Sequence, residues 1–215
     1  MTPKEVRARI EETGIVAAVR VDSAEDALFA AEGVIGGGIP IIEITLTVPN
    51  ATKVISQLVK NFPHTVVGAG GVRTLGAARQ CLDVGALFLT SDGLHPTVVE
   101  FAVQEGIVAI PGALTPTEVM HAWEANSDFV KVVPCAQIGG ETYVGSLHRM
   151  FPNIPLIAAG GVSQKNASKF IFAGATALGI GRELLPPEAL RLRQAGRISN
   201  LAQRFLSYVT SGRTH

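Results

Sequence analysis

Short apolar runs rich in β-branched residues recur along the chain about every 20 to 30 residues, and an amphipathic stretch of helical length follows each of them. β-Branched residues favour strands, whereas apolar residues spaced three or four positions apart favour helices. The pattern therefore predicts eight strands that alternate with helices. The predicted strands cover residues 15–19, 41–46, 65–68, 86–90, 107–110, 129–133, 155–158 and 175–180.

Polar residues mark the starts of several predicted helices. Ser23 can cap the helix after the first strand, and Thr115 precedes Glu118 at the spacing of a capping box. Ser163 is a natural N-cap for a helix over residues 163–173. The other helices are predicted over residues 3–12, 50–61, 75–84, 96–105, 141–150 and 187–211.

Eight near-continuous apolar strands separated by helices indicate a parallel sheet that is buried on both faces. Eight such units close into a (β/α)8 TIM barrel, and residues 3–12 would form an extra N-terminal helix that covers its N-terminal face. The alternative is an open, doubly wound sheet, which would carry a glycine-rich phosphate loop after its first strand. Residues 20–23, Arg-Val-Asp-Ser, are not glycine-rich, so a single barrel domain over residues 1–215 is the prediction.

Composition and charge limit the classes of partner. The 215 residues include 18 basic and 18 acidic ones, a balance that gives no electrostatic case for nucleic acid or an anionic membrane. The first residues lack the apolar core of a signal peptide, and the longest apolar stretch, 33–42, is broken by glycines and Pro40. Two cysteines are too few for a disulfide framework. We therefore expect a cytoplasmic protein that acts on a small molecule.

Lys131 is the least expected residue in any predicted strand. It lies in Phe-Val-Lys-Val-Val-Pro, residues 129–134, whereas the other lysines fall in segments of helical or turn character. Burying an ammonium is costly, so such a lysine tends to lose its proton and become the nucleophilic amine that Schiff-base chemistry requires. The alternative is a lysine with a buried stem whose tip meets a carboxylate or water.

Glu43 is a second charged residue in an apolar strand. A lone carboxylate in Pro-Ile-Ile-Glu-Ile-Thr, residues 40–45, is expected to point into the barrel, and alternation places Thr45 and Thr47 on the same side. Because such barrels place their chemistry at the C-terminal ends of the strands, Glu43 and Lys131 can act together as general base and nucleophile. A purely structural ion pair between the two is the alternative.

Glycines and polar residues follow the other strands. Gly160 and Gly161 come after the seventh strand, where backbone N–H groups at a helix N-terminus could hold an anion, and Arg182 after the eighth strand could add charge. Alternatively, these glycines only permit tight turns. No metal-ligand spacing links the histidines, and no cofactor motif stands out. The other candidates at strand ends are Arg20, Gly70, Gly71, Ser91 and Pro111.

With Glu43 on the second strand and Lys131 on the sixth, the chain resembles a known family over nearly its whole length. These are the class I aldolases that cleave 2-keto-3-deoxy-6-phosphogluconate (KDPG) or 4-hydroxy-2-oxoglutarate (KHG) to pyruvate and an aldehyde. The resemblance implies that Lys131 is the Schiff-base lysine and Glu43 the acid/base. It also implies a carbon–carbon lyase that needs no metal or other cofactor, because the iminium is the electron sink, and a homotrimer. The motifs that carry it are Ile-Glu-Ile-Thr at 42–45, Val-Gly-Ala-Gly at 67–70, Ile-Pro-Gly at 110–112, Val-Lys-Val-Val-Pro at 130–134 and Ala-Gly-Gly-Val at 159–162.

The chain departs from the family at positions that the resemblance assigns to substrate binding. Gly71 stands where a threonine hydroxyl usually contacts the pyruvate carboxylate, and Thr47 stands where many members have an arginine. Asp92 replaces a common proline, and Arg182-Glu183 replaces a Gly-Ser pair that helps to hold phosphate.

Two other functions stay open on this evidence. One is a catalytically impaired barrel that binds 2-keto acids or sugar phosphates, because the hydroxyl expected at Gly71 is lost. The other is a phosphate-binding barrel with a different reaction, such as an isomerase or synthase, and this leaves Lys131 unexplained. Arg20 or Arg182 could hold an anionic group of the substrate in any of these cases.

Overall fold

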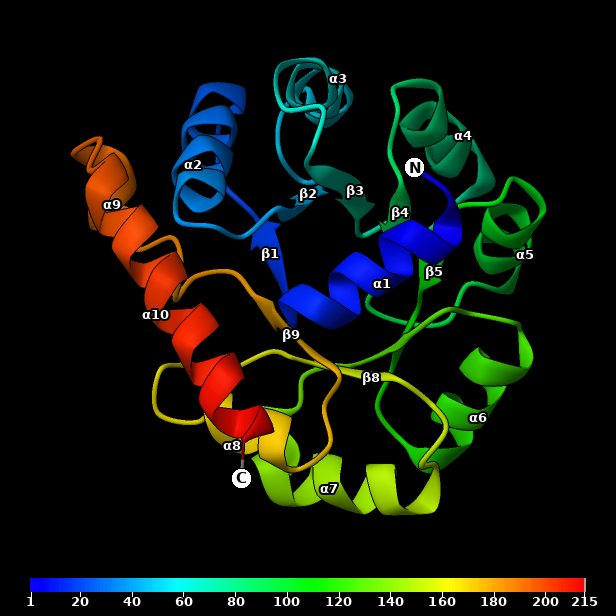
Figure 1. The fold of residues 1–215 in the computed structure, drawn as a ribbon. Helices are drawn as coiled ribbons and strands as arrows, with labels where there is room; N and C mark the ends of the chain where they lie inside the picture. Colours follow the sequence, from blue (N-terminus) through cyan, green and yellow to red (C-terminus); the bar gives the residue numbers. More distant parts are fainter. Residues whose placement is uncertain (215) are drawn as a thin grey trace.

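The computed structural model describes residues 1–214 and shows parallel strands surrounded by helices (Figure 1). Every strand pairing is parallel, in the order β5-β4-β3-β2-β1-β9-β8-β7-β6. The predicted (β/α)8 barrel is therefore confirmed. The strands are β1 (Ile15–Val19), β2 (Ile41–Thr45), β3 (Val66–Gly70), β4 (Phe88–Thr90), β5 (Val108–Ile110), β6 (Gly112–Ala113), β7 (Val130–Val132), β8 (Leu156–Ala159) and β9 (Ala177–Ile180).

The fifth strand of the barrel is interrupted at Pro111, which separates β5 from β6. Proline has no N–H to donate to a ladder, so the two halves pair with different neighbours, β5 with β4 and β6 with β7. The Pro111 carbonyl still accepts a hydrogen bond from the Lys131 backbone N–H at 2.9 Å. Because β5 and β6 are the two ends of the strand order and adjoin in sequence, the sheet closes on itself, which excludes the open-sheet alternative.

The helices follow the predicted alternation with the strands. Ser23 caps α2, and Thr115 with Glu118 forms the predicted capping box at the start of α6. The predicted last helix is two helices, which a bend at residues 192–194 separates. The helices are α1 (Pro3–Thr13), α2 (Ala24–Gly36), α3 (Ala51–Asn61), α4 (Leu75–Asp83), α5 (Pro96–Gln104), α6 (Pro116–Glu124), η1 (Ala136–Ile138), α7 (Gly140–Met150), α8 (Ala167–Phe172), α9 (Pro187–Arg191) and α10 (Ala195–Arg213).

The prediction of Ser163 as an N-cap is wrong. Asn166 is the residue before α8, and its Oδ1 accepts the Ser163 N–H at 2.7 Å while its Nδ2 donates to the Gly161 carbonyl at 3.0 Å. These two bonds satisfy the backbone in a turn where helical bonds would otherwise form. The segment after β8 is consequently a loop, and α8 is short.

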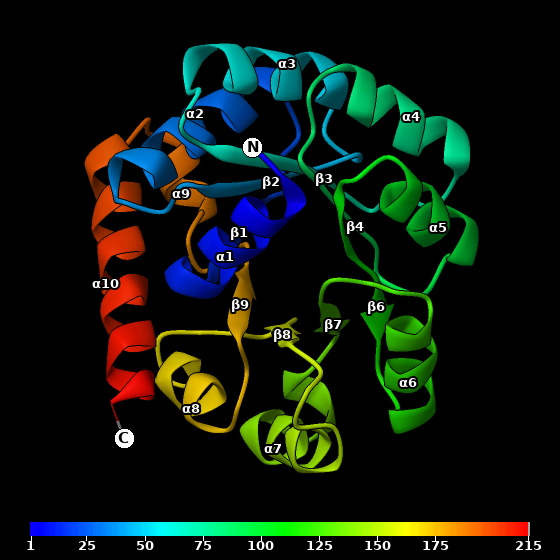
Figure 2. The ribbon, with the colours of Figure 1, turned by 45° about the vertical axis from the view of Figure 1, so that its right-hand side comes forward.

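Two apolar cores stabilise the barrel, and α1 covers the N-terminal end of the inner one (Figures 1 and 2). The outer core lies between the strands and their helices, and α10 packs against α2 and α8. Val6 and Ile10 of α1 join the inner core. Within residues 1–214, the helices are all too short or too polar to cross a bilayer. The other members of the inner core are Phe129, directly before β7, and the strand residues Val16, Ile41, Val66, Phe88, Val108, Ile110, Ile157 and Ala177.

Candidate active site

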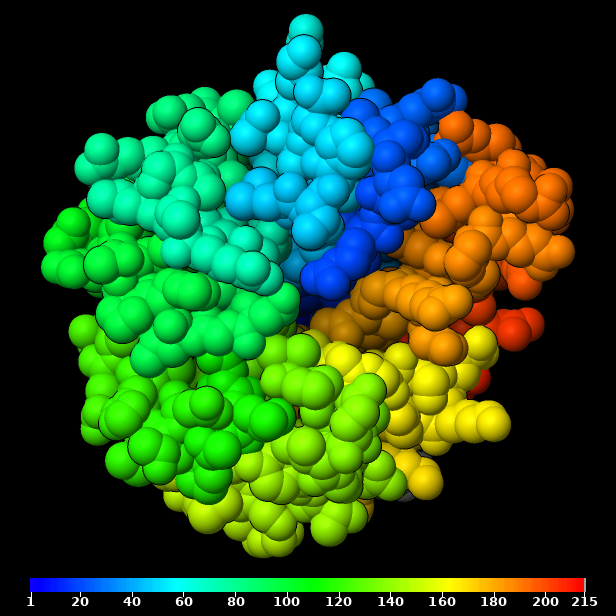
Figure 3. All heavy atoms as spheres, turned by 180° about the vertical axis from the view of Figure 1, so that it is seen from behind, coloured from blue at the N-terminus to red at the C-terminus, as the bar shows by residue number. Residues whose placement is uncertain are grey.

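The inner face of the barrel changes from apolar to polar along its axis. Two residues beyond each of the core residues Ile41, Phe88 and Phe129, the next inward positions carry Glu43, Thr90 and Lys131. Each of these three polar side chains is buried, with at most 7% of its surface exposed. The loops that follow the strands surround the barrel centre on the face opposite α1 (Figure 3). Lys131 and Glu43 thus share the interior at this end.

The ammonium group of Lys131 forms an ion pair with Asp92, the second residue after β4. Lys131 Nζ donates a hydrogen bond to Asp92 Oδ1 at 3.0 Å. The lysine therefore is not left alone in apolar surroundings, and its ion-pair partner among residues 1–214 is Asp92 rather than Glu43. Sequence reasoning allowed for a carboxylate at the lysine tip but named the wrong one.

Three cations influence the charge of the Asp92 carboxylate. Burial raises the pKa of Asp92, but Lys131, Arg20 and Arg73 outweigh that effect and hold the pKa below its usual value of 3.8. Arg20 Nη2 lies 3.9 Å from Asp92 Oδ2, and Arg20 itself is exposed at the mouth. Asp92 is therefore ionised at neutral pH, and Lys131 Nζ faces a full negative charge.

The carboxylate of Glu43 has a different surrounding. Thr90 Oγ1 donates a hydrogen bond to Glu43 Oε2 at 2.9 Å. Glu43 Oε1 lies over Gly70, where a Cβ atom would overlap it. Gly70 thus makes room for the carboxylate, which sits between a neutral donor and bare backbone.

The remaining side chains after β2 to β4 build the rim. Thr45 Oγ1 donates to the Val19 carbonyl at 3.1 Å and lies 2.9 Å from the hydroxyl of Thr47, which is exposed. Ser91 is buried, and its hydroxyl donates to the Gly93 carbonyl at 2.6 Å. That bond closes the loop that carries Asp92. Ser91 therefore orders this loop, and its hydroxyl hydrogen is engaged within the protein.

Gly71 adopts a backbone conformation that favours glycine. Its φ is 72°, and no atom lies within 4 Å of the place where a Cβ would be. A threonine here would find space but would have to adopt a left-handed conformation that L-residues rarely take. The position where the family resemblance expects a threonine hydroxyl thus has a backbone conformation that favours glycine.

The loops after β8 and β9 differ from the predicted anion site at a helix N-terminus. Gly160 and Gly161 have φ values of 80° and 88°, and a Cβ at either would collide with the turn after β7, at Pro134 and Ala136 respectively. No helix begins at Gly161, because α8 starts only at Ala167. The glycines therefore allow tight turns and the close packing of two loops, in line with the alternative to an anion site. Arg182 lies exposed directly after β9.

Sequence reasoning missed two side chains that contact the central pair. Thr90 could have been found, because alternation from Phe88 places it on the inward side of β4. Asp92 was noted only as a departure from proline, since a loop residue carries no periodicity that would predict its direction. Arg73, after β3, gave no signal either.

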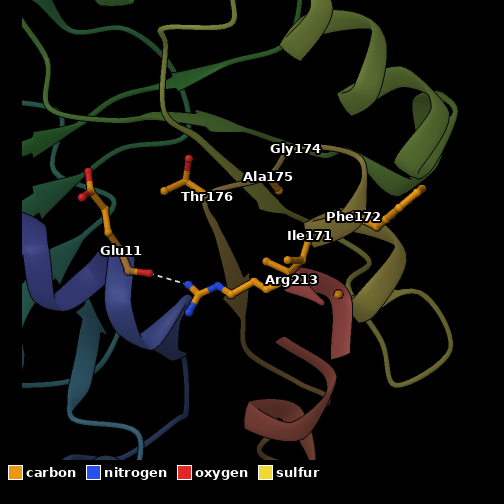
Figure 4. Close-up of a pocket in the computed structure, with 8 residues that line it drawn as sticks. Glu11, Ile171, Phe172, Gly174, Ala175, Thr176 and Arg213 are labelled. Atoms are coloured by element: carbon orange, nitrogen blue, oxygen red, sulfur yellow. Dashed lines mark hydrogen bonds between the residues drawn. The ribbon is translucent and has the colours of Figure 1, made fainter. Parts of the chain in front are cut away.

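A hollow also lies at the N-terminal end of the barrel, between α1, α8 and α10 (Figure 4). Its two charged residues are already engaged. Glu11 pairs with Arg7 at 3.0 Å, while Arg213 donates to the backbone carbonyls of Glu11 and Glu12. Among residues 1–214, no group of three or more His, Cys, Asp or Glu side chains could hold a metal ion. The strand-end face, with Lys131, Glu43 and Asp92, therefore remains the candidate site.

Known proteins resemble this chain over most of its length. The aldolase family model described as KDPG and KHG aldolase matches residues 6–201. The 2-dehydro-3-deoxy-phosphogluconate aldolase of Treponema pallidum is 26% identical over 200 residues, which cover 93% of this chain and 95% of that protein. A Rhizobium meliloti protein named "Probable 2-dehydro-3-deoxy-6-phosphogalactonate aldolase" is 32% identical over 163 residues, covering 73% of this chain and 76% of its own.

Solved structures agree with the sequence relatives. The KDPG aldolase of Legionella pneumophila, with pyruvate captured as a covalent carbinolamine intermediate, has 27% identity and a TM-score of 0.85. That alignment covers 92% of this chain and 96% of the Legionella chain. These matches support aldol cleavage of a keto-deoxy-phosphosugar as the activity. The chain belongs to the KDPG and KHG aldolase family.

Proposed function

We propose that this protein is a class I aldolase that cleaves a 2-keto-3-deoxy-6-phospho-sugar acid, or 4-hydroxy-2-oxoglutarate, to pyruvate and an aldehyde through a Schiff base on Lys131. The observation that carries the proposal is the burial of Lys131 and Glu43 at the strand-end side of the barrel interior. The Legionella relative holds pyruvate as a carbinolamine, the adduct that an amine forms with a ketone before it loses water.

The reaction starts when the Lys131 amine adds to the C2 ketone of the substrate. Glu43 moves the protons that are needed to form and dehydrate the carbinolamine, which leaves an iminium on C2. Glu43 then takes the proton of the C4 hydroxyl, the C3–C4 bond breaks, and its electrons flow into the iminium. The aldehyde leaves, the enamine is protonated at C3, and hydrolysis releases pyruvate and the free amine.

A trapping experiment tests this function. The protein is incubated with pyruvate and reduced with cyanoborohydride, and the adduct is located by peptide mass spectrometry. We expect a single reduced pyruvate adduct on Lys131 and none in Lys131→Met. Absence of the adduct in the wild-type protein would falsify the Schiff-base mechanism. An adduct without aldol cleavage would instead support the impaired binder, for which Gly71 is the motivating residue.

The substrate phosphate is a separate matter. Arg20 and Arg182 are exposed arginines after the neighbouring strands β1 and β9, and the loop with Gly160 and Gly161 follows β8, on the other side of β9. We expect kcat/KM to be higher for a phosphorylated substrate than for its dephosphorylated form. Equal values would mean that no residue at this face binds phosphate productively. A cytoplasmic homotrimer is the expected form, and sedimentation equilibrium would show three times the chain mass.

A further inference from the structure

Asp92 is the charged group that contacts the reacting nitrogen, and the catalytic scheme above gives it no role. Its Oδ1 accepts a hydrogen bond from Lys131 Nζ at 3.0 Å, within the range of charge-assisted hydrogen bonds. The loop that carries it is closed by the bond between the Ser91 hydroxyl and the Gly93 carbonyl. Arg20 lies 3.9 Å from its other oxygen, Oδ2, and Arg73 adds further positive charge that lowers its pKa. The structure thus aims one fixed anion at one nitrogen.

The charge balance of imine formation shows what such an anion can do. An ammonium and a ketone give an iminium and water, so the nitrogen is positively charged at both ends of the step and neutral only in between. A carboxylate beside the nitrogen stabilises both charged states. It can also take a proton while the amine attacks and give it back when water leaves.

We propose that Asp92 is a third catalytic residue of this site: it acts on the Lys131 nitrogen and supplies the proton for the departing C2 hydroxyl, while Glu43 moves the other protons on the substrate oxygens; this rests on the Schiff-base function proposed above. Asp92 takes a proton from the ammonium, the free amine adds to C2, and a proton passes from nitrogen to oxygen to give the neutral carbinolamine. Asp92 then returns its proton to the departing hydroxyl, so that water and the iminium form and Asp92 is again an anion. It remains the counter-ion of the iminium until hydrolysis.

Asp92 and Glu43 have different neighbours, which suits them to different roles in the reaction. Lys131, Arg20 and Arg73 keep Asp92 ionised, so the protonated form is short-lived and the counter-ion role dominates. Glu43 has the neutral Thr90 hydroxyl as its donor. The charged groups that act on Asp92 are Lys131, Arg20 and Arg73, and Glu43 is the other charged side chain buried in the described barrel interior.

The test measures cyanoborohydride trapping of pyruvate on Lys131 across pH for the wild-type protein, Asp92→Asn and Asp92→Glu. We expect Asp92→Asn to trap pyruvate about 100-fold more slowly at pH 7, and Asp92→Glu to recover part of the loss. As pH falls through the lowered pKa of Asp92, which itself lies below 3.8, wild-type Asp92 is neutralised, so the ratio of the two rates should approach one. The ratio removes every pH effect that both proteins share. A merely structural role of Asp92 would leave this ratio constant.

Asp22→Asn is the matched control. Asp22 is an exposed acid on the loop after β1, on the same face, and it makes no ion pair with Lys131 among residues 1–214. The Asp22→Asn variant should trap pyruvate at the wild-type rate. Circular dichroism at each pH checks that all variants stay folded. If the wild-type protein forms the adduct on Lys131 and Asp92→Asn traps pyruvate as fast or faster, the proposed role of Asp92 is overturned and the Schiff-base function stands. A wild-type protein without that adduct overturns the Schiff-base function itself.

Discussion

The two buried charged side chains of the barrel interior are held by different kinds of neighbour. Lys131 donates a hydrogen bond to an anion, the Asp92 carboxylate, while Glu43 meets a hydroxyl and bare backbone. A carboxylate with one neutral donor can change its protonation state without breaking an ion pair. That property suits the acid/base role proposed for Glu43.

Replacing Thr90 by Val keeps the shape of the side chain and removes the donor to Glu43. A hydrogen bond to a charged group contributes about 1.5–3 kcal/mol, so we expect kcat for aldol cleavage to fall about 10- to 100-fold. Thr90→Ser keeps the hydroxyl and should retain most of the activity. Steady-state kinetics with detection of released pyruvate measures both. If Thr90→Val and Thr90→Ser turn over equally fast, the hydrogen bond does not orient Glu43 for catalysis.

At the scale of elements, periodicity predicted most of the fold, and it failed where side chains bond to the backbone. The alternation of strands and helices was visible because apolar spacing differs between the two. The late start of α8, at Ala167 rather than after Ser163, was not visible, because it depends on two bonds of one side-chain amide, that of Asn166. Glu43 and Lys131 stood out as charges within apolar strands. Asp92 did not, since the direction of a loop side chain depends on tertiary contacts.

The capping box of α6 gives this element a pH-dependent contribution to stability. Backbone N–H groups of Thr115 and Leu114 donate to the Glu118 carboxylate and lower its pKa below 4.5 in the folded protein. A carboxyl with a lowered folded-state pKa stabilises the fold above its unfolded-state pKa, and the contribution disappears as pH falls through the folded-state value.

We therefore expect Glu118→Gln to lower the free energy of unfolding at pH 7, and we expect this difference to disappear as pH falls through the folded-state pKa of Glu118, which lies below 4.5. Urea denaturation at pH 7 and at a pH below that folded-state value measures it. Glu124→Gln, on an exposed residue at the other end of α6, is the control and should show no such loss at pH 7. A Glu118→Gln penalty that is the same at both pH values would mean that ionisation of Glu118 does not matter.

Over the whole molecule, stability and chemistry are assigned to opposite ends of the barrel. The inner core near α1 is apolar throughout. Glu43, Thr90 and Lys131 each lie two positions along the chain beyond a residue of that core. This arrangement is general for barrels of this type, in which the N-terminal face serves stability and the C-terminal face carries the active site. The two ends should accordingly respond separately to mutation.

Ile10 of α1 tests this separation, because it is fully buried in the inner core at the N-terminal end. Ile10→Ala leaves a cavity there and should lower the free energy of unfolding by about 2–5 kcal/mol. Under native conditions the variant should still trap pyruvate on Lys131 at close to the wild-type rate, because the layer of Ile41, Phe88 and Phe129 lies between α1 and the site. Leu75→Ala, on a side chain that is 37% exposed, is the control and should change stability by no more than about 0.5 kcal/mol. Urea denaturation and trapping rates on the same samples measure the two effects. If Ile10→Ala stays folded but no longer forms the adduct, α1 helps to position the catalytic residues, and the two ends of the barrel are coupled.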